Sequence, residues 1–183
     1  MSENQLNDLK TKIQLLANEQ STFYKTLKRS LENVQRKYND SIFSYFNHSI
    51  ALAKSEKDKH FILGSFTICN YSNNPLSSPI ILIKIFTDES FDFSGKFKHP
   101  KSKEKNIHFA WERVDQEDGD PMREYWLKPI STKQLQPGET LEFNQFQLNF
   151  SSNQGKHILI EGFIYFQEIK EGLPSHNSIN VSW

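Results

Sequence analysis

The N-terminal part of the chain contains no glycine and no proline between Ser2 and Ser55. Within this stretch, large apolar side chains recur at steps of three and four residues, with Gln20 at the in-frame position between Leu16 and Phe23 and a drift near Ser30. The apolar positions are Leu6, Leu9, Ile13, Leu16, Phe23, Leu27, Leu31 and Val34. These steps average about 3.5 residues, which is the period of a coiled coil. Because such a stripe needs a partner helix, the pattern predicts a coiled-coil helix over residues 1–58 that forms a dimer or a trimer of the chain with itself.

A second interpretation places a break near residues 39–41. Asp40 or Ser41 has the side chain of a helix N-cap and could begin a separate helix from Ile42 to Lys54. That helix would be apolar over a wide arc and would pack against the domain that follows it. We expect one unbroken helix, and the broken helix remains the alternative.

After residue 58, helical periodicity stops and glycine and proline separate short runs that are rich in β-branched and aromatic residues. Such runs predict strands at residues 60–71, 80–87, 107–114, 124–129, 141–150, 157–167 and 178–183. The pair Asn144-Gln145 interrupts the alternation of the 141–150 strand, which predicts a β-bulge. Residues 59–183 are therefore expected to form an all-β antiparallel sandwich of about seven strands.

Two runs in this region carry a resemblance to a known class of domain. Phe66 begins the run Phe-Thr-Ile-Cys-Asn-Tyr-Ser-Asn-Asn-Pro-Leu, which is followed by Ile-Ile-Leu-Ile-Lys-Ile from Ile80. Together they resemble the opening hairpin of bacterial immunoglobulin-like domains, and Leu135-Gln-Pro-Gly-Glu-Thr-Leu-Glu-Phe is similar to a later turn and strand of them. The resemblance implies a sandwich and no particular activity.

The overall charge and the hydropathy pattern exclude several classes of protein. The chain has 22 basic and 22 acidic residues, so neither nucleic acid nor an anionic membrane is expected as its main partner. No apolar run is long enough for a membrane-spanning helix and the N-terminus lacks a signal-type apolar segment, so we expect a cytoplasmic protein. The single cysteine, Cys69, lies in an expected strand and is predicted to be a small buried apolar residue.

Residue patterns for catalysis and metal binding are also missing from the sequence. The six histidines lack zinc-site spacing, and there is no P-loop, dinucleotide fingerprint or nucleophile elbow. A metal site built from scattered ligands is the alternative, and we expect neither a metal nor a cofactor. The sequence thus predicts a protein that is not an enzyme.

Two charged loops are candidate surfaces. The acidic stretch from Asp115 to Asp120, which includes Asp118, is predicted to be a solvated turn, with calcium binding as the alternative, although the EF-hand pattern fails. The basic loop is also predicted to be solvated, with an acidic protein or phosphates as alternative partners, and it contains Lys101, Lys103 and Lys105. The two loops could also pair between subunits.

Aromatic side chains are the remaining candidates for recognition. Trp111 alternates with Phe109, and Trp126 stands between Tyr125 and Leu127 in an expected strand. Both tryptophans are predicted first as core residues and second as part of a partner or ligand surface.

These observations together predict a non-enzymatic interaction or structural protein. A coiled-coil stalk would set the oligomeric state, and the sandwich would bind another protein or build a larger assembly, such as a virus or phage particle. The alternative is a multimeric module whose sandwich binds a carbohydrate or another small molecule, with the helix providing avidity. A hetero-complex through the helix is a third hypothesis, and an enzyme is the fourth.

Overall fold

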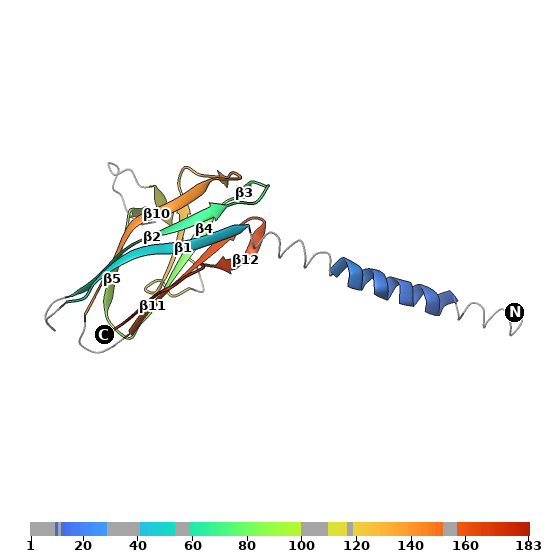
Figure 1. Cartoon of the computed structure of the whole chain (residues 1–183), viewed down its shortest axis with the longest axis horizontal. Helices are drawn as coiled ribbons and strands as arrows, with labels where there is room; N and C mark the ends of the chain where they lie inside the picture. Colours follow the sequence, from blue (N-terminus) through green and yellow to red (C-terminus); the bar gives the residue numbers. More distant parts are fainter. Residues whose placement is uncertain are drawn as a thin grey trace, which may run out of the picture. The chain divides into compact units, whose positions relative to one another are not determined.

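The computed structural model describes residues 10, 12–28, 41–53, 59–99, 110–116, 119–151 and 157–183. The chain divides into two compact units, Met1–Asp40 and Ser41–Trp183 (Figure 1). The described part of the first unit is helical, and the second unit holds all the described strands.

Residues 12–28 form an α-helix, which confirms the helix prediction for this segment. Ile13, Leu16, Phe23 and Leu27 lie on one helical face, and between 43% and 65% of each side chain is exposed. Pairing of this helix with another is not seen in the single chain. The other predicted seam positions, Leu6, Leu9, Leu31 and Val34, lie outside the described residues. No helix among the described residues is long and apolar enough to cross a bilayer.

The expectation that the helical region continues to residue 58 is wrong for Ile42–Ala51. These residues form strand β1, which pairs with β2 (His60–Asn70) over ten consecutive residues. Ile42, Ser44 and Phe46 are buried while the residues between them face outward, so the period is two. The apolar residues of Ile42–Ala51 also fit the steps of three and four that are typical of a helix, so the sequence pattern alone is ambiguous. The long antiparallel pairing with β2 stabilises the strand.

The first sheet has the strand order β1-β2-β10-β5, with β10 at Thr140–Phe150 and β5 at Phe91–Ser94. All its pairings are antiparallel. Its register shifts between Phe143 and Phe146, which confirms the predicted bulge, and Gln145 adopts a positive φ of 57° there. A positive φ at a residue other than glycine is uncommon outside such irregularities.

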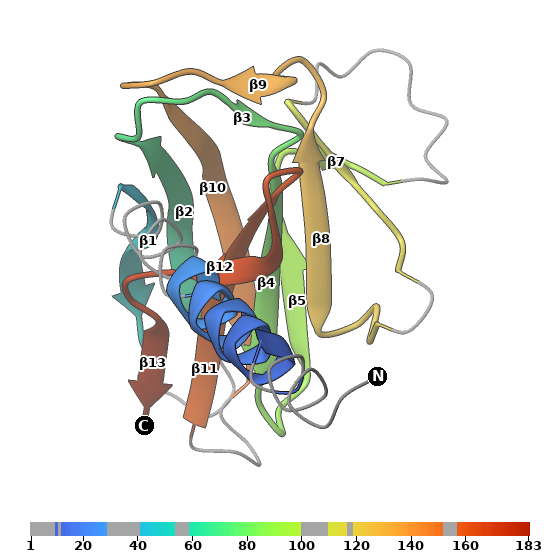
Figure 2. The same cartoon turned by 90° about the vertical axis from the view of Figure 1, so that its right-hand side faces the viewer.

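The second sheet is mixed. Its strands are, in order across the sheet, β12 (Ile169–Pro174), β11 (His157–Phe166), β4 (Ile80–Phe86), β8 (Glu124–Pro129), β7 (Trp111–Arg113) and β6 (Phe97–Lys98). Strand β13 (Ile179–Ser182) also pairs with β11. Strands β6 and β7 are parallel, so the prediction of a wholly antiparallel sandwich is corrected at this edge. A small third sheet pairs β3 (Leu76–Ser77) with β9 (Gln134–Leu135), and Figure 2 shows them together at one end of the strands.

The core lies between the inner faces of the two large sheets. Four phenylalanine side chains are at most 1% exposed, and they are Phe66, Phe143, Phe146 and Phe150. Gly162 of β11 faces Phe66 and Phe46 of the first sheet, and a Cβ at this position would lie 2.3 Å from Cε2 of Phe66. The two sheets can therefore approach this closely only because residue 162 has no side chain.

The two sheets are joined along both sides. On one side, Gly95 connects β5 of the first sheet to β6 of the second. On the other side, Asn177, between β12 and β13, binds the main chain of β1. Its Oδ1 accepts from the N–H of Phe46 at 2.7 Å, and its Nδ2 donates to the carbonyl of Phe46 at 2.9 Å. This contact covers part of the free edge of β1, which would otherwise expose unpaired main-chain groups.

Candidate functional site

The two tryptophans proposed for a ligand or partner surface lie in different environments. Trp111 is 2% exposed, its ring centroid is 5.7 Å from that of Phe143, and its Nε1 donates to the carbonyl of Glu142 at 3.2 Å. Trp111 is thus a core residue, which confirms the first prediction for it and corrects its assignment to a binding surface. Cys69 is buried as predicted, and burial raises the pKa of its thiol.

Trp126 lies on the outer face of the second sheet, so the first prediction for it, a core residue, is wrong. The neighbouring Tyr125 and Leu127 are buried in the core, and because side chains alternate along a strand, Trp126 points the other way and is half-buried. A cavity of about 400 Å³ opens beside it. The cavity is lined by Arg113, Val114, Asp115, Gln116, Gly119, Asp120, Pro121, Glu124 and Trp126. The fold therefore brings together Trp126 and Asp120, two of the residues that the sequence singled out.

The indole of Trp126 is supported from the sheet. Its ring centroid is 5.0 Å from that of Tyr165 on β11, with an angle of 40° between the ring planes. Leu82 of β4 lies opposite Trp126 in the register and is only 1% exposed although it faces outward. Gly172 leaves room for Tyr165, since a Cβ there would lie 2.5 Å from its Cε1. Burial raises the pKa of the Tyr165 hydroxyl.

The carboxylate of Glu124 lies beside the indole N–H of Trp126. Trp126 Nε1 donates to Oε2 of Glu124 at 3.4 Å, and Glu124 Oε1 forms an ion pair with Lys84 Nζ at 2.9 Å. Lys84 is opposite Glu124 in the register of β4 and β8, so the pair follows from the strand pairing. The charge of Glu124 is thereby balanced beside the cavity.

Arg113 forms another wall of the cavity and is already engaged in several contacts. Its Nη2 donates to the carbonyls of Pro121 and Glu124, the latter at 3.1 Å, and its guanidinium lies 4.5 Å from the centre of the Tyr125 ring. The Tyr125 hydroxyl donates to the carbonyl of Met122 at 3.2 Å. Burial is the main cause that raises the pKa of Tyr125, and the Arg113 charge opposes this rise. Arg113 thus holds the β7–β8 connection together.

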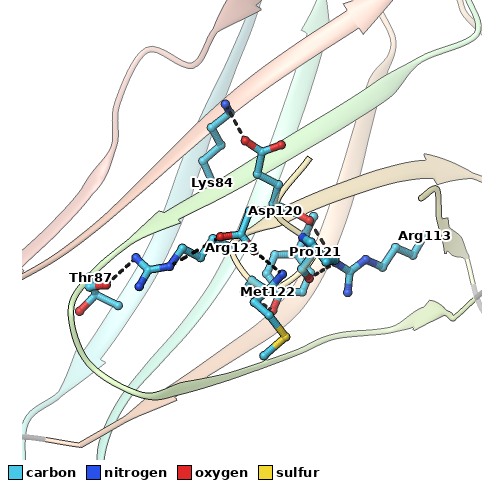
Figure 3. Close-up of polar contacts among 9 residues, drawn as sticks. Lys84, Thr87, Arg113, Asp120, Pro121, Met122 and Arg123 are labelled. Carbon is cyan, nitrogen blue, oxygen red and sulfur yellow. Dashed lines mark hydrogen bonds and ion pairs between the residues drawn. The ribbon is translucent and has the colours of Figure 1, made fainter. Parts of the chain in front are cut away.

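Asp120 organises the turn that closes the cavity. Its Oδ1 accepts from the N–H of Met122 at 2.9 Å, and its Oδ2 is 3.8 Å from Nε of Arg123. Arg123 in turn donates to the carbonyl of Thr87 at 2.6 Å. Figure 3 shows Arg113 and Arg123 on opposite sides of the turn from Asp120 to Met122. The turn is therefore tied to the sheet by two arginines.

The remaining predicted site residues lie outside the described residues. These are Lys101, Lys103 and Lys105 of the basic loop and Asp118 of the acidic stretch. Within the described part of the chain, no three or more histidine, cysteine, aspartate or glutamate residues are grouped so that they could hold a metal ion.

Sequence reasoning missed Arg113 and Glu124 in the lining of the cavity, and Lys84 and Tyr165, which contact Glu124 and Trp126 respectively. The available signal was the alternation of the strands, because Lys84 is on the opposite face from Ile81 and Ile83. The register that sets Glu124 beside Lys84 cannot be obtained from one sequence, since it depends on which strands become neighbours.

A second, shallower hollow of about 200 Å³ lies on the first sheet beside the bulge. Its lining residues are Asn47, His48, Ser49, Leu63, Gly64, Ser65, Asn144 and Gln145. Among the described residues, the only aromatic ring that lines it is the imidazole of His48, whereas the indole of Trp126 lines the larger cavity.

No family model and no curated protein sequence matches the chain. Among solved structures, a FixG-related protein from Vibrio parahaemolyticus is 7% identical, over 76% of this chain and 94% of that chain, with a TM-score of 0.37. A GH20 exo-β-N-acetylglucosaminidase from Vibrio harveyi is 13% identical, over 78% of this chain and 18% of that chain, with a TM-score of 0.31. A CBM of Ruminiclostridium thermocellum is 15% identical, over 78% and 88% of the chains, with a TM-score of 0.29. Likenesses of this degree assign neither a family nor a function.

Proposed function

We propose that the chain is a non-enzymatic interaction protein whose N-terminal helix pairs with copies of itself and whose β domain presents a binding surface. The observation that carries this proposal is the exposed stripe of the helix. Four large apolar side chains, Ile13, Leu16, Phe23 and Leu27, repeat along one face and are 43–65% exposed in the single chain. A contiguous apolar stripe is uncommon on the surface of a monomeric protein and supports an interaction site.

The free energy available from burying this stripe is of the same order as the cost of self-association. Full burial of one leucine, isoleucine or phenylalanine side chain contributes about 1.5–3 kcal/mol. Because each of these side chains is only 43–65% exposed in the single chain, the eight side chains of a dimer contribute roughly 7–14 kcal/mol, which is comparable with an association cost on the order of 10 kcal/mol. The helix is the stalk of the proposed assembly, and each copy carries one β domain.

The polar residue in the stripe predicts the direction of pairing. Gln20 occupies the seam position between Leu16 and Phe23, and a polar side chain in a coiled-coil seam favours the arrangement in which it meets its own copy. This arrangement is parallel and in register.

Cysteine cross-linking tests this pairing. We expect Gln20→Cys to form an intermolecular disulfide under mild oxidation, and Asn18→Cys, on the opposite face, to form far less. Cys69 gives little background, because it is buried and its thiol pKa is raised. Equal cross-linking at positions 18 and 20 would contradict a specific seam.

We further propose that the β domain is immunoglobulin-like. The order β1-β2-β10-β5 in one sheet and β12-β11-β4 in the other matches the ABED and GFC sheets of a constant-type immunoglobulin domain. Strands β6, β7, β8 and β9 are then an insertion between the fourth and fifth strands. This assignment places the cavity beside Trp126 in the insertion and not in the common core.

A specific observation favours the alternative function, a multimeric module that binds a small ligand. The cavity beside Trp126 combines an aromatic wall with several polar side chains, and its volume of about 400 Å³ lies in the usual range for small-molecule sites. The helical stalk would then increase the avidity of several weak sites. Binding that depends on Trp126 tests this alternative.

A further inference from the structure

The geometry of the cavity points to a chemical class of ligand: we propose that it binds neutral carbohydrates through stacking on the indole of Trp126. This inference rests on the ligand-binding function proposed above. Three features of the cavity support it: a fixed aromatic wall, a balanced set of charges and a dense set of hydrogen-bonding groups.

The indole of Trp126, which forms the aromatic wall, is positioned by contacts within the protein. Tyr165 packs 5.0 Å from Trp126, and Glu124 holds the indole N–H. Leu82, opposite Trp126 in the register, is fully covered. Sugar rings present a patch of C–H groups on one face, and a flat, immobile ring can bury such a patch at little entropic cost.

The charges around the cavity disfavour an ionic ligand. Glu124 is paired with Lys84 at 2.9 Å, and Asp120 is 3.8 Å from Arg123. The guanidinium of Arg113 is engaged by two carbonyls and the Tyr125 ring. An anion would meet the carboxylates of Asp115, Asp120 and Glu124, while a cation would compete with the existing ion pairs for two of these three.

The polar groups of the lining instead match a ligand with many hydroxyl groups. Each carboxylate has several lone pairs, so Asp115, Asp120 and Glu124 can accept from hydroxyls while they keep their present contacts. The amide of Gln116 supplies both a donor and an acceptor. Hydroxyl groups both donate and accept, and a neutral sugar carries them around the edge of its ring. The cavity thus offers acceptors at its rim and an apolar face at Trp126.

Ligand-observed saturation-transfer NMR on the full chain tests the inference. Three sets of probes are used: neutral sugars (glucose, galactose, mannose and N-acetylglucosamine), acidic sugars (glucuronate and sialic acid) and cations (choline and spermidine). We expect transfer to at least one neutral sugar. Titration of that sugar should show affinity reduced on the order of 10-fold or more by Trp126→Ala, which corresponds to about 1.4 kcal/mol.

Matched variants separate a binding role from a structural one. Trp126→Phe keeps a ring and is expected to weaken binding only about three-fold. Gln116→Ala removes one lining amide and is expected to weaken binding without a change in the thermal midpoint. Tyr71→Ala is the control, because Tyr71 is an aromatic residue that is 61% exposed and lies outside the cavity lining, and it should leave the affinity unchanged.

The other outcomes contradict the proposal in distinguishable ways. One such outcome is saturation transfer only to choline, spermidine or the acidic sugars, with loss of this transfer in Trp126→Ala. It would overturn neutral carbohydrates as the ligand class and leave the ligand-binding function standing. A second outcome is that a neutral sugar binds with the same affinity to the unaltered protein and to Trp126→Ala, Trp126→Phe and Gln116→Ala. It would overturn the assignment of sugar binding to this cavity. The absence of any Trp126-dependent signal overturns both.

Discussion

The helix and the β domain use the same kinds of apolar side chain in opposite ways. Phe23 on the helix is 65% exposed, whereas Phe66 in the β domain is 0% exposed. Ile13 and Leu16 are 60% and 63% exposed, while Ile62 of β2 is fully buried. The β domain thus buries a large apolar core within one chain, although some of its apolar side chains, such as Met122 and Ile130, are exposed, whereas the four stripe residues of the helix are all exposed. The proposed division of roles, with stability in the β domain and association through the helix, can be tested with variants of each region.

The strongest test of this comparison is the same substitution in both regions. Phe66→Ala removes a fully buried ring and should lower the free energy of unfolding of the β domain by about 3–5 kcal/mol. Phe23→Ala should change it by less than about 0.5 kcal/mol. Urea unfolding followed by tryptophan fluorescence measures both, because all three tryptophans, Trp111, Trp126 and Trp183, belong to the β domain. A comparable loss in the two variants would contradict the separation of roles.

A smaller effect locates the stability within the β domain. Asn177→Ala removes two hydrogen bonds to the main chain of Phe46 and should cost about 1–3 kcal/mol in the same assay. Asn180→Ala is the matched control, since Asn180 is exposed and contacts only the ring of His157 in the described part of the chain. It should cost less than about 0.5 kcal/mol. If the two variants lose the same free energy, the connection between β1 and the β12–β13 segment is not a stabilising one.

The smallest expected effect has the opposite sign. Ser44 is fully buried in β1, and its hydroxyl has no hydrogen-bond partner among the described residues. Ser44→Ala removes this polar group and should raise the free energy of unfolding by up to about 1 kcal/mol. Ser49→Ala, on the exposed side of the same strand, should have no measurable effect. A loss of stability in Ser44→Ala would show that the hydroxyl does have a partner.

Alternation and turn residues predicted much of the β domain. All seven expected strands overlap observed ones, and the bulge at Asn144 and Gln145 is confirmed. The strands that were missed are mostly two to six residues long, and such short segments carry too little pattern to be separated from loops. The exception is β1, whose ten residues satisfy both a helical and a strand period.

The candidate site was less predictable than the fold. Trp126 and Asp120 could be selected from the sequence because an aromatic residue and an acidic turn stand out there. Trp111 was selected on the same grounds and is in the core, because residue type alone does not tell which face of a strand is covered. The supporting contact between Lys84 and Glu124 depends on the register of strands that are distant in the sequence.

The central claim is that the helix seam makes the chain an oligomer, and its most direct test is the solution mass of three full-length proteins by light scattering across a dilution series. Unaltered protein should have the mass of a dimer or trimer of the 21.5 kDa chain. The double variant Leu16→Glu/Phe23→Glu should be monomeric, since it places charges in the seam. Gln14→Glu/Asn18→Glu adds the same charge on the opposite face and should keep the oligomeric mass. A mass of 21.5 kDa for the unaltered protein at every concentration would contradict the account.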